Sequence, residues 1–135
     1  MTTMPKPDES GVVTKTTPRS VSETVARLTS LLHSKGMKVF VVIDQSAEAR
    51  QVGLDLRDTV MVVFGNPTAG TPVMEAVPLA ALDLPLKVLL WDDAGQTKIS
   101  YVAPSVIAAR YGLSPNLGQN LAGIDALTDL LVGSS

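Results

Sequence analysis

The chain of 135 residues carries 11 basic and 13 acidic side chains, dispersed along its length, for a formal net charge of −2. It has no cysteine, which excludes thiolate zinc sites, iron–sulfur clusters, thiol nucleophiles and disulfide bonds. The balanced charge and the aromatic content of 4% provide neither a basic nor a stacking surface, so we expect no nucleic acid as a partner.

The length predicts one domain with a single core, in which residues 11–135 fold and residues 1–10 form a flexible N-terminal tail. That tail has no apolar stretch resembling a secretory signal. The longest apolar runs, Val39–Ile43 and Val60–Phe64, are far shorter than the roughly 20 residues that cross a bilayer. We therefore expect a soluble cytoplasmic protein with no membrane partner.

The chain is also rich in apolar residues, with a hydrophobic share of 45% and a positive mean hydropathy. A chain of this size must cover itself with polar surface, and burial between subunits is one way to remove the excess from water. The composition therefore favours a homodimer.

The first elements combine several local signals. Gly11–Thr17, rich in valine and threonine, predicts a short strand. Ser20 and Glu23 have capping-box spacing and predict the start of a helix, which Gly36 can end. The apolar residues of this helix fall on one stripe, as in a helix packed on a core: Val21, Val25, Leu28 and Leu32.

The apolar, β-branched run Lys38–Ile43 predicts a strand buried on both faces, as in the interior of a sheet. Asp44 can cap a short helix over Ala47–Val52, which a glycine can end. Apolar and charged residues then alternate around Leu54 and Leu56, which is typical of a short edge segment or a connector.

A further buried strand is predicted at Thr59–Phe64, followed by a loop rich in glycine, asparagine and proline. A Thr-Pro pair after this loop offers a cap and a first-turn proline, so we expect a helix over Pro72–Ala76. A turn or short helix at Leu79–Leu82, bracketed by prolines, leads to a third apolar strand at Leu86–Trp91.

The chain then turns at Asp92–Gly95, and the alternating run Thr97–Val102 predicts an antiparallel hairpin with one wet face. A short helix is predicted at Pro104–Tyr111, and a final amphipathic helix from Leu117 to Leu131. The hairpin connection is too short for a parallel crossover. We therefore expect an α+β fold, with a single mixed, largely antiparallel sheet of about four to five strands and helices packed on it. A doubly wound α/β fold is the alternative.

The loop from Gly65 to Thr71 is the candidate binding site. It permits unusual backbone angles, and it leads into a helix whose N-terminus would attract an anion. It lacks the Gly-Lys-Ser/Thr ending of a Walker loop, and a purely structural turn is the competing interpretation. The candidate ligand-binding residues are Gly65, Asn66, Pro67, Thr71 and Glu75.

An enzyme is the alternative class of function, with Glu75 or Asp44 as the acid–base carboxylate in a pocket formed on folding and Tyr101 as a further candidate. Helix capping explains Asp44 and a first-turn position explains Glu75 without any catalytic role. The single histidine, His33, is more simply placed near a helix C-terminus than on a metal. The motifs of serine hydrolases, zinc proteases and dinucleotide enzymes do not occur, so we expect no cofactor and no metal and favour a protein without catalytic activity.

Three stretches of the sequence resemble one known family. They are F-G-N-P-T-A-G-T-P-V-M at Phe64–Met74, D-L-P-L-K-V-L-L-W at Asp83–Trp91 and V-V-I-D-Q-S-A-E-A-R-Q-V-G-L-D-L-R at Val41–Arg57. In these stretches the chain resembles domain-of-unknown-function family 302, over roughly Val12 to Tyr111. The resemblance implies a small α+β domain that tends to form homodimers, and it implies no activity.

We therefore expect an uncharacterised homodimeric domain that binds a small molecule or an anion near the Gly65–Thr71 loop. A protein–protein interaction module is a further alternative, and it predicts a large exposed apolar patch. The C-terminal segment Leu117–Val132 lies beyond the resemblance, and it would either cap the core or join a subunit interface.

Overall fold

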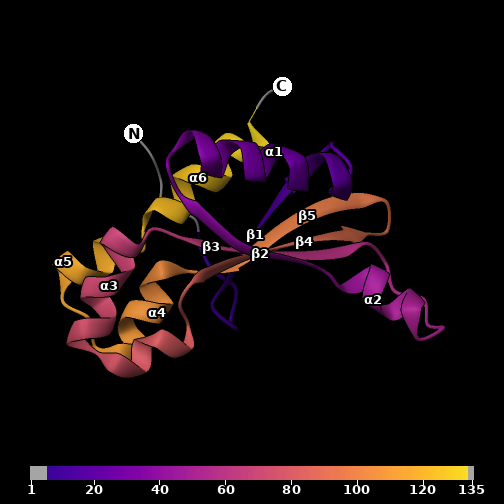
Figure 1. The fold of residues 1–135 in the computed structure, drawn as a ribbon. Helices are drawn as coiled ribbons and strands as arrows, with labels where there is room; N and C mark the ends of the chain where they lie inside the picture. Colours follow the sequence, from indigo (N-terminus) through magenta and orange to yellow (C-terminus); the bar gives the residue numbers. More distant parts are fainter. Residues whose placement is uncertain (1–5, 134–135) are drawn as a thin grey trace.

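The computed structural model describes residues 6–133, which form a five-stranded sheet in the order β1-β5-β4-β3-β2, with helices on both sides (Figure 1). Every neighbouring pair of strands is antiparallel. The strands are β1 (Val12–Thr17), β2 (Lys38–Asp44), β3 (Thr59–Gly65), β4 (Leu86–Asp93) and β5 (Gln96–Val102). The α+β class and the largely antiparallel sheet predicted from the sequence are confirmed.

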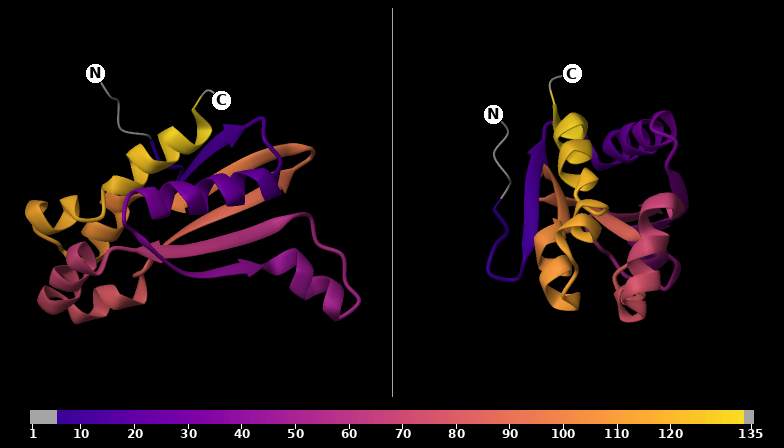
Figure 2. Two further views of the ribbon diagram at one scale, coloured as in Figure 1. Left: turned by 45° about the horizontal axis from the view of Figure 1, so that its top comes forward. Right: turned by 90° about the vertical axis from the view of Figure 1, so that its left-hand side faces the viewer.

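Helices fill the connections between the strands. They are α1 (Val21–Ser34), α2 (Gln45–Gln51), α3 (Pro67–Ala76), the 3-10 helix η1 (Pro78–Leu82), α4 (Pro104–Tyr111), α5 (Pro115–Gln119) and α6 (Gly123–Val132). Helices α1 and α6 lie across one face of the sheet, whereas α3, α4 and α5 gather at one end and α2 projects at the other (Figures 1 and 2).

The main core lies between the sheet and the two helices α1 and α6. Burial alternates along β3, where Val60, Val62 and Phe64 are buried and the residues between them are partly exposed. This period of two places one apolar side of each strand against the helices. The fully buried residues of this core include Leu28, Leu32, Val62, Phe64, Val88, Leu90, Ile99 and Leu131.

A smaller core holds the helices that gather at one end of the sheet. Its buried residues come from α3, η1, α4 and the turn before α6: Val73, Ala80, Ile107 and Leu121. Asp83 lies outside this core and links the end of η1 to α4. Its carboxylate accepts hydrogen bonds from Tyr111 Oη at 2.5 Å and Arg110 Nη1 at 2.8 Å. This end of the molecule therefore has packing of its own, and a cavity can form where it meets the sheet.

The C-terminal helix α6 caps the main core and is held by polar contacts, most of them partly buried. Tyr101 Oη donates to Asp125 Oδ1 at 2.5 Å, and Lys15 Nζ donates to Thr128 Oγ1 at 2.7 Å and to Asp129 Oδ1 at 2.8 Å. Two arginines of the α1 region, Arg19 and Arg27, donate to the carbonyl oxygen of Leu131 near the end of α6. Cations at a helix C-terminus interact favourably with its dipole.

Several local predictions are confirmed at atomic detail. The Ser20 hydroxyl accepts from the backbone N–H of Glu23 at 3.1 Å, and the Asp44 carboxylate accepts from that of Ala47 at 2.9 Å. The hairpin between β4 and β5 turns at Ala94 and Gly95, whose φ angles are 52° and 92°. Two positive φ angles in sequence suit the right-handed twist of a hairpin.

Two predicted helices were wrong in position. Helix α3 begins at Pro67 rather than Pro72, with Asn66 as its cap, so Pro72 lies inside the helix. The final helix predicted from Leu117 to Leu131 is broken into α5 and α6 around residues 120–122. The Asn-Pro and Thr-Pro pairs carry the same cap-and-proline signal, and sequence alone could not tell which of them starts the helix.

Strand β2 is not an interior strand, as its composition predicted, but an edge strand that pairs only with β3. Phe40, Val41 and Val42 are 44%, 44% and 43% exposed. An apolar run indicates that its side chains are more stable when buried. It does not indicate whether they are buried by the same chain or by another one.

The predicted flexible tail lies partly outside the described residues, since the description begins at residue 6. Where the tail joins the domain, the Asp8 carboxylate accepts hydrogen bonds from the backbone N–H groups of Ser10 and Val12. These bonds hold a turn in front of β1.

Replacing Tyr101 with phenylalanine is expected to lower the free energy of unfolding by about 2 kcal/mol, because the variant loses a partly buried hydrogen bond to a charged carboxylate and keeps the ring. Urea unfolding followed by circular dichroism measures the change. A loss below about 0.5 kcal/mol would show that the Tyr101–Asp125 hydrogen bond does not help to hold α6 on the sheet.

Candidate functional site

A cavity of about 230 Å³ opens where the end of the β2–β3 pair meets α3 and the turn between α5 and α6. Its wall is mainly apolar, and two asparagines carry the side-chain hydrogen-bonding groups. The lining residues are Met37, Phe40, Gly65, Asn66, Pro67, Ala69, Gly70, Met74, Leu84, Pro85, Leu86, Asn120 and Leu121.

Gly65 ends β3 at the floor of the cavity. A Cβ atom at this position would lie 3.5 Å from Phe40 Cε2 and 3.6 Å from Pro85 Cβ, which is ordinary van der Waals contact. A Cβ atom would therefore fit between the β2 side chain and the residue before β4. Further along, Gly70 on α3 has only Met74 Cε near its Cβ direction, at 3.9 Å, so the wall there is open.

The N-terminus of α3 has its donors occupied. Asn66 Oδ1 accepts from the N–H of Thr68 at 3.0 Å, and the Asn66 carbonyl oxygen accepts from the N–H groups of Ala69 and Gly70 at 2.9 Å. Pro67 has no N–H to offer. The first-turn amides that would bind an anion are thus already used within the loop.

Asn120 links two parts of the wall that are distant in sequence. Its Nδ2 atom donates to the carbonyl oxygen of Ala69 at 3.0 Å, which joins the α5–α6 turn to the first turn of α3. Asn120 and Leu121 were not among the candidates from the sequence, and neither were Met37 and Phe40. No local motif marks them, because only the tertiary fold brings them to the loop.

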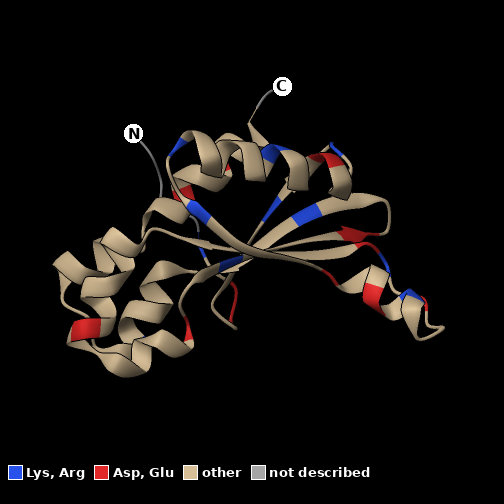
Figure 3. Ribbon diagram, in the orientation of Figure 1, with Lys and Arg blue, Asp and Glu red and all other residues tan. Residues whose placement is uncertain are grey.

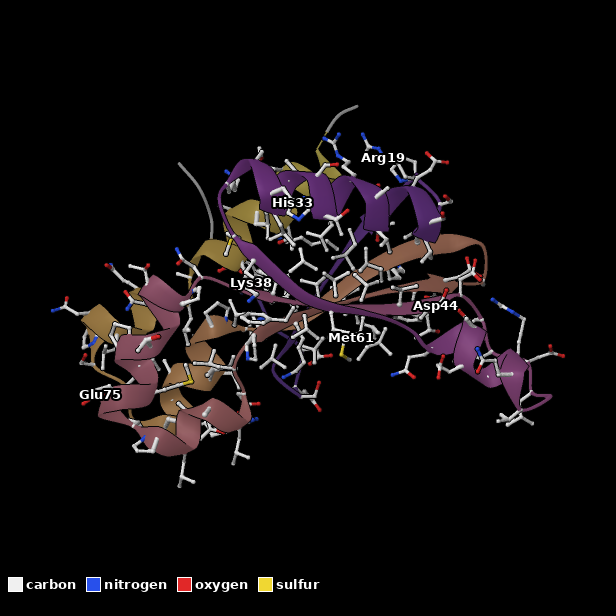
Figure 4. All side chains as sticks on the ribbon, viewed as in Figure 1. Arg19, His33, Lys38, Asp44, Met61 and Glu75 are labelled. Atoms are coloured by element: carbon white, nitrogen blue, oxygen red, sulfur yellow. The ribbon has the colours of Figure 1, made fainter. Side chains whose placement is uncertain are left out.

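Three of the five sequence candidates, Gly65, Asn66 and Pro67, line the cavity. Thr71 and Glu75 are exposed on α3 and are not part of the lining. Figure 4 shows Glu75 at the outer end of the helical group.

The acid–base candidates do not share a pocket. Asp44 caps α2 at one end of the molecule and Glu75 lies at the other (Figure 4). The Ser46 hydroxyl and the Ala47 N–H bond the Asp44 carboxylate and lower its pKa, so it stays ionised as a cap. Tyr101 is buried under α6, where desolvation and its bond to Asp125 raise the pKa of the phenol. The enzyme alternative is left without an assembled set of these groups.

Two further kinds of site concern residues 6–133: a metal site and a membrane span. Within this range, no three histidine or acidic side chains lie close enough together to hold a metal ion. In the same part of the chain, no helix has both the length and the apolar character needed to cross a membrane. His33 is exposed in the last turn of α1, as Figure 4 shows.

Asp83, which follows η1 and bonds to Tyr111 and Arg110 on α4, has a carboxyl with a shifted pKa. The Tyr111 hydroxyl, followed by Arg110, lowers the pKa of this carboxyl below its ordinary value of 3.8. A carboxyl whose pKa is lowered on folding stabilises the folded state above its unfolded pKa, and that stability is lost as pH falls through the folded pKa.

Asp83→Asn is therefore expected to reduce the free energy of unfolding by about 1 kcal/mol at pH 7 and by the same amount down to about pH 4, because the carboxylate is ionised throughout. Below that pH the difference from the native chain should shrink as Asp83 becomes protonated. Urea unfolding at a series of pH values measures it. A difference that grows on acidification would contradict the assigned direction of the pKa shift.

Comparison with known proteins shows that the chain matches one family. A family model described as "Domain of unknown function DUF302" matches residues 13–131. A crystal structure described as "uncharacterized conserved protein DUF302 from Bacillus stearothermophilus" superposes with a TM-score of 0.77 at 23% identity, over 90% of this chain and 95% of that one. It shares the fold.

The curated relatives of this chain are longer proteins. "Fluoride-specific ion channel FluC 1" of Brucella suis and the protein of the same name from Brucella abortus are each 38% identical over 106 residues, which is 78% of this chain. The match covers 42% and 39% of those proteins. The chain thus spans about two fifths of the length of the relatives it matches.

Proposed function

The chain belongs to the DUF302 family of domains of unknown function, and we propose that it is a homodimeric domain that binds a small, mainly apolar molecule beside the Gly65–Thr71 segment. The observation that carries this proposal is the cavity itself, whose wall is assembled from the nominated loop and four other segments. Concave, mostly apolar sites with a few polar groups are the usual form of small-molecule pockets.

The lining indicates the class of ligand. Met37, Met74 and Phe40 offer flexible and flat apolar surface, and methionine adapts to ligands of varied shape. Asn66 and Asn120 stand at the rim as exposed amides that can orient one polar group. A neutral molecule of one to three rings fits this chemistry better than an anion, because the first-turn amides of α3 are already bonded.

Gly70→Leu tests the pocket without damaging the fold. Leucine favours a helix over glycine by about 0.5–1 kcal/mol, and its side chain would enter the open part of the wall beside Met74. We expect the variant to be at least as stable as the native chain to heat and to bind the neutral fluorophore N-phenyl-1-naphthylamine at least about tenfold more weakly, by loss of apolar contact area. Fluorescence titration measures the affinity.

Gly123→Leu is the matched control, since Gly123 is also helical, has nothing within 4 Å of its Cβ direction and lies outside the lining. It should bind the fluorophore like the native chain. Inorganic phosphate should neither stabilise the protein nor displace the fluorophore. Equal binding by both variants, or no binding by the native chain, would remove the support for this pocket as a ligand site.

The homodimer is supported by the apolar composition and by the exposed apolar side chains of β2. An exposed apolar edge strand associates readily with other chains unless something covers it. Sedimentation at micromolar concentration should therefore give about twice the chain mass of 14.2 kDa. A single species at the chain mass would count against the homodimer.

A second candidate function is an interaction module that acts on a membrane channel. The similarity to about two fifths of the length of fluoride-specific channel proteins favours this candidate. In this case the matched segment of the Brucella suis protein modulates the rest of that protein. Deleting the segment and measuring fluoride release from vesicles tests it: an altered fluoride response with conduction retained supports a modulating role, and an unchanged response opposes it.

A further inference from the structure

We propose that a second copy of this chain completes the pocket: two β2 strands pair antiparallel at their free edges, and the segment Asp44–Asp58 of each copy covers the cavity of the other. We name this segment the arm. The inference rests on the proposed homodimer and pocket, and it adds which surfaces meet and which residues of the partner reach the site.

The two edges of the sheet differ in a way that selects one of them. At the β1 edge the exposed or partly exposed side chains include Thr14, Lys15 and Thr16, and polar or charged residues protect an edge from association. At the β2 edge the corresponding side chains are Phe40 and Val41, each 44% exposed. The β2 edge has the apolar surface and free backbone groups of a strand that pairs further, whereas β1 does not.

The two-fold symmetry of a dimer then determines which part of one copy contacts which part of the other. The cavity lies at the N-terminal end of β2, where Met37 and Phe40 line it, and the arm leaves from the C-terminal end at Asp44. A two-fold axis at the middle of β2, Val41, reverses the strand direction and brings each end beside the opposite end of the other copy. Three residues of strand, about 10 Å, separate Val41 from either end of β2, so the arm starts beside the partner's cavity.

The arm has the shape and the surface for this contact. It projects beyond the sheet on the side opposite α1 and α6, and α3 projects on that same side at the other end (Figures 1 and 2). Its apolar side chains face solvent: Val52 is 72%, Leu54 63% and Leu56 43% exposed. Three exposed apolar residues on one projecting segment match the apolar rim of the cavity.

The charges of the two ends are complementary. Residues 44–58 contain four acidic and two basic side chains, for a net charge of −2, whereas residues 35–43 contain two lysines and no acid. Figure 3 shows blue at the start of β2 and both red and blue along the arm. Antiparallel pairing sets the acidic arm against the basic end of β2, whereas parallel pairing would set like charges together.

The arm also provides the area that a strand pair lacks. A stable interface buries about 800 Å² on each partner, which is more than two seven-residue strands supply alone. The arm and the cavity rim occur twice in a two-fold dimer, and both contacts add apolar surface at once.

Cysteine cross-linking tests the arrangement directly, because the chain has no cysteine of its own. Val41→Cys should form a covalent dimer under mild oxidation, since directly opposed residues of an antiparallel pair lie within disulfide reach. Leu56→Cys mixed with Met74→Cys should give a mixed dimer. Leu130→Cys, with 49% exposure on α6, is the matched control and should remain largely uncoupled.

Ligand binding supplies a second readout. Leu56→Ser should weaken N-phenyl-1-naphthylamine binding at least about tenfold at protein concentrations where the dimer persists, because the arm no longer offers an apolar cover. Leu130→Ser should bind like the native chain.

Each outcome decides a different point. Coupling at Val41 together with the Leu56–Met74 link supports the arrangement, even if the native chain fails to bind the fluorophore and the pocket proposal is thereby lost. A non-covalent dimer in which neither pair couples above the Leu130→Cys control would overturn the arrangement while leaving the homodimer intact. A monomer would overturn both.

Discussion

The antiparallel pairing of β2 with β3 is the interaction on which the site depends. It brings Met37 and Phe40 beside Gly65 at one end, and it directs the chain into α2 at the other. Because the pairing puts β2 at the edge of the sheet, one set of backbone bonds creates both the rim of the cavity and the exposed apolar strand. The proposed ligand site and the proposed subunit contact therefore have a common origin.

The cavity also depends on the helices α3, α4 and α5, which must pack stably without placing side chains inside the cavity. The smaller core around Val73 and Ile107 supplies that, and the contacts of Asp83 with Tyr111 and Arg110 hold η1 against α4 from outside. Asn66 and Asn120 hold the first turn of α3 from two sides. The N–H groups at the start of α3 that would attract an anion are already hydrogen-bonded within the protein. Dispersion and apolar burial are therefore left as the main sources of affinity for a ligand.

How much could be predicted from the sequence depended on the range of the interaction. Ser20, Asp44 and Asp92 each bond a backbone N–H three positions away, and the caps and the turn that they form were predicted correctly. The position of β2 in the sheet depends on which strands pair, and an apolar run carries no record of that. The same limit applies to the site: Gly65, Asn66 and Pro67 were found as a motif, whereas Asn120 reaches the loop from 51 residues away in sequence. The failed prediction for β2 is itself informative, because its sequence resembles a buried strand and the chain alone does not bury it.

Hydrogen–deuterium exchange of the β2 backbone, followed as a function of protein concentration, tests the central claim most directly. Amide groups at a free edge exchange rapidly, whereas those bonded to a neighbouring strand are protected. The account predicts that peptides covering Lys38–Asp44 become protected as protein concentration rises, together with those covering residues 52–56 of the arm, while β1 stays unchanged. Exchange in β2 that is equally fast at every concentration would contradict it.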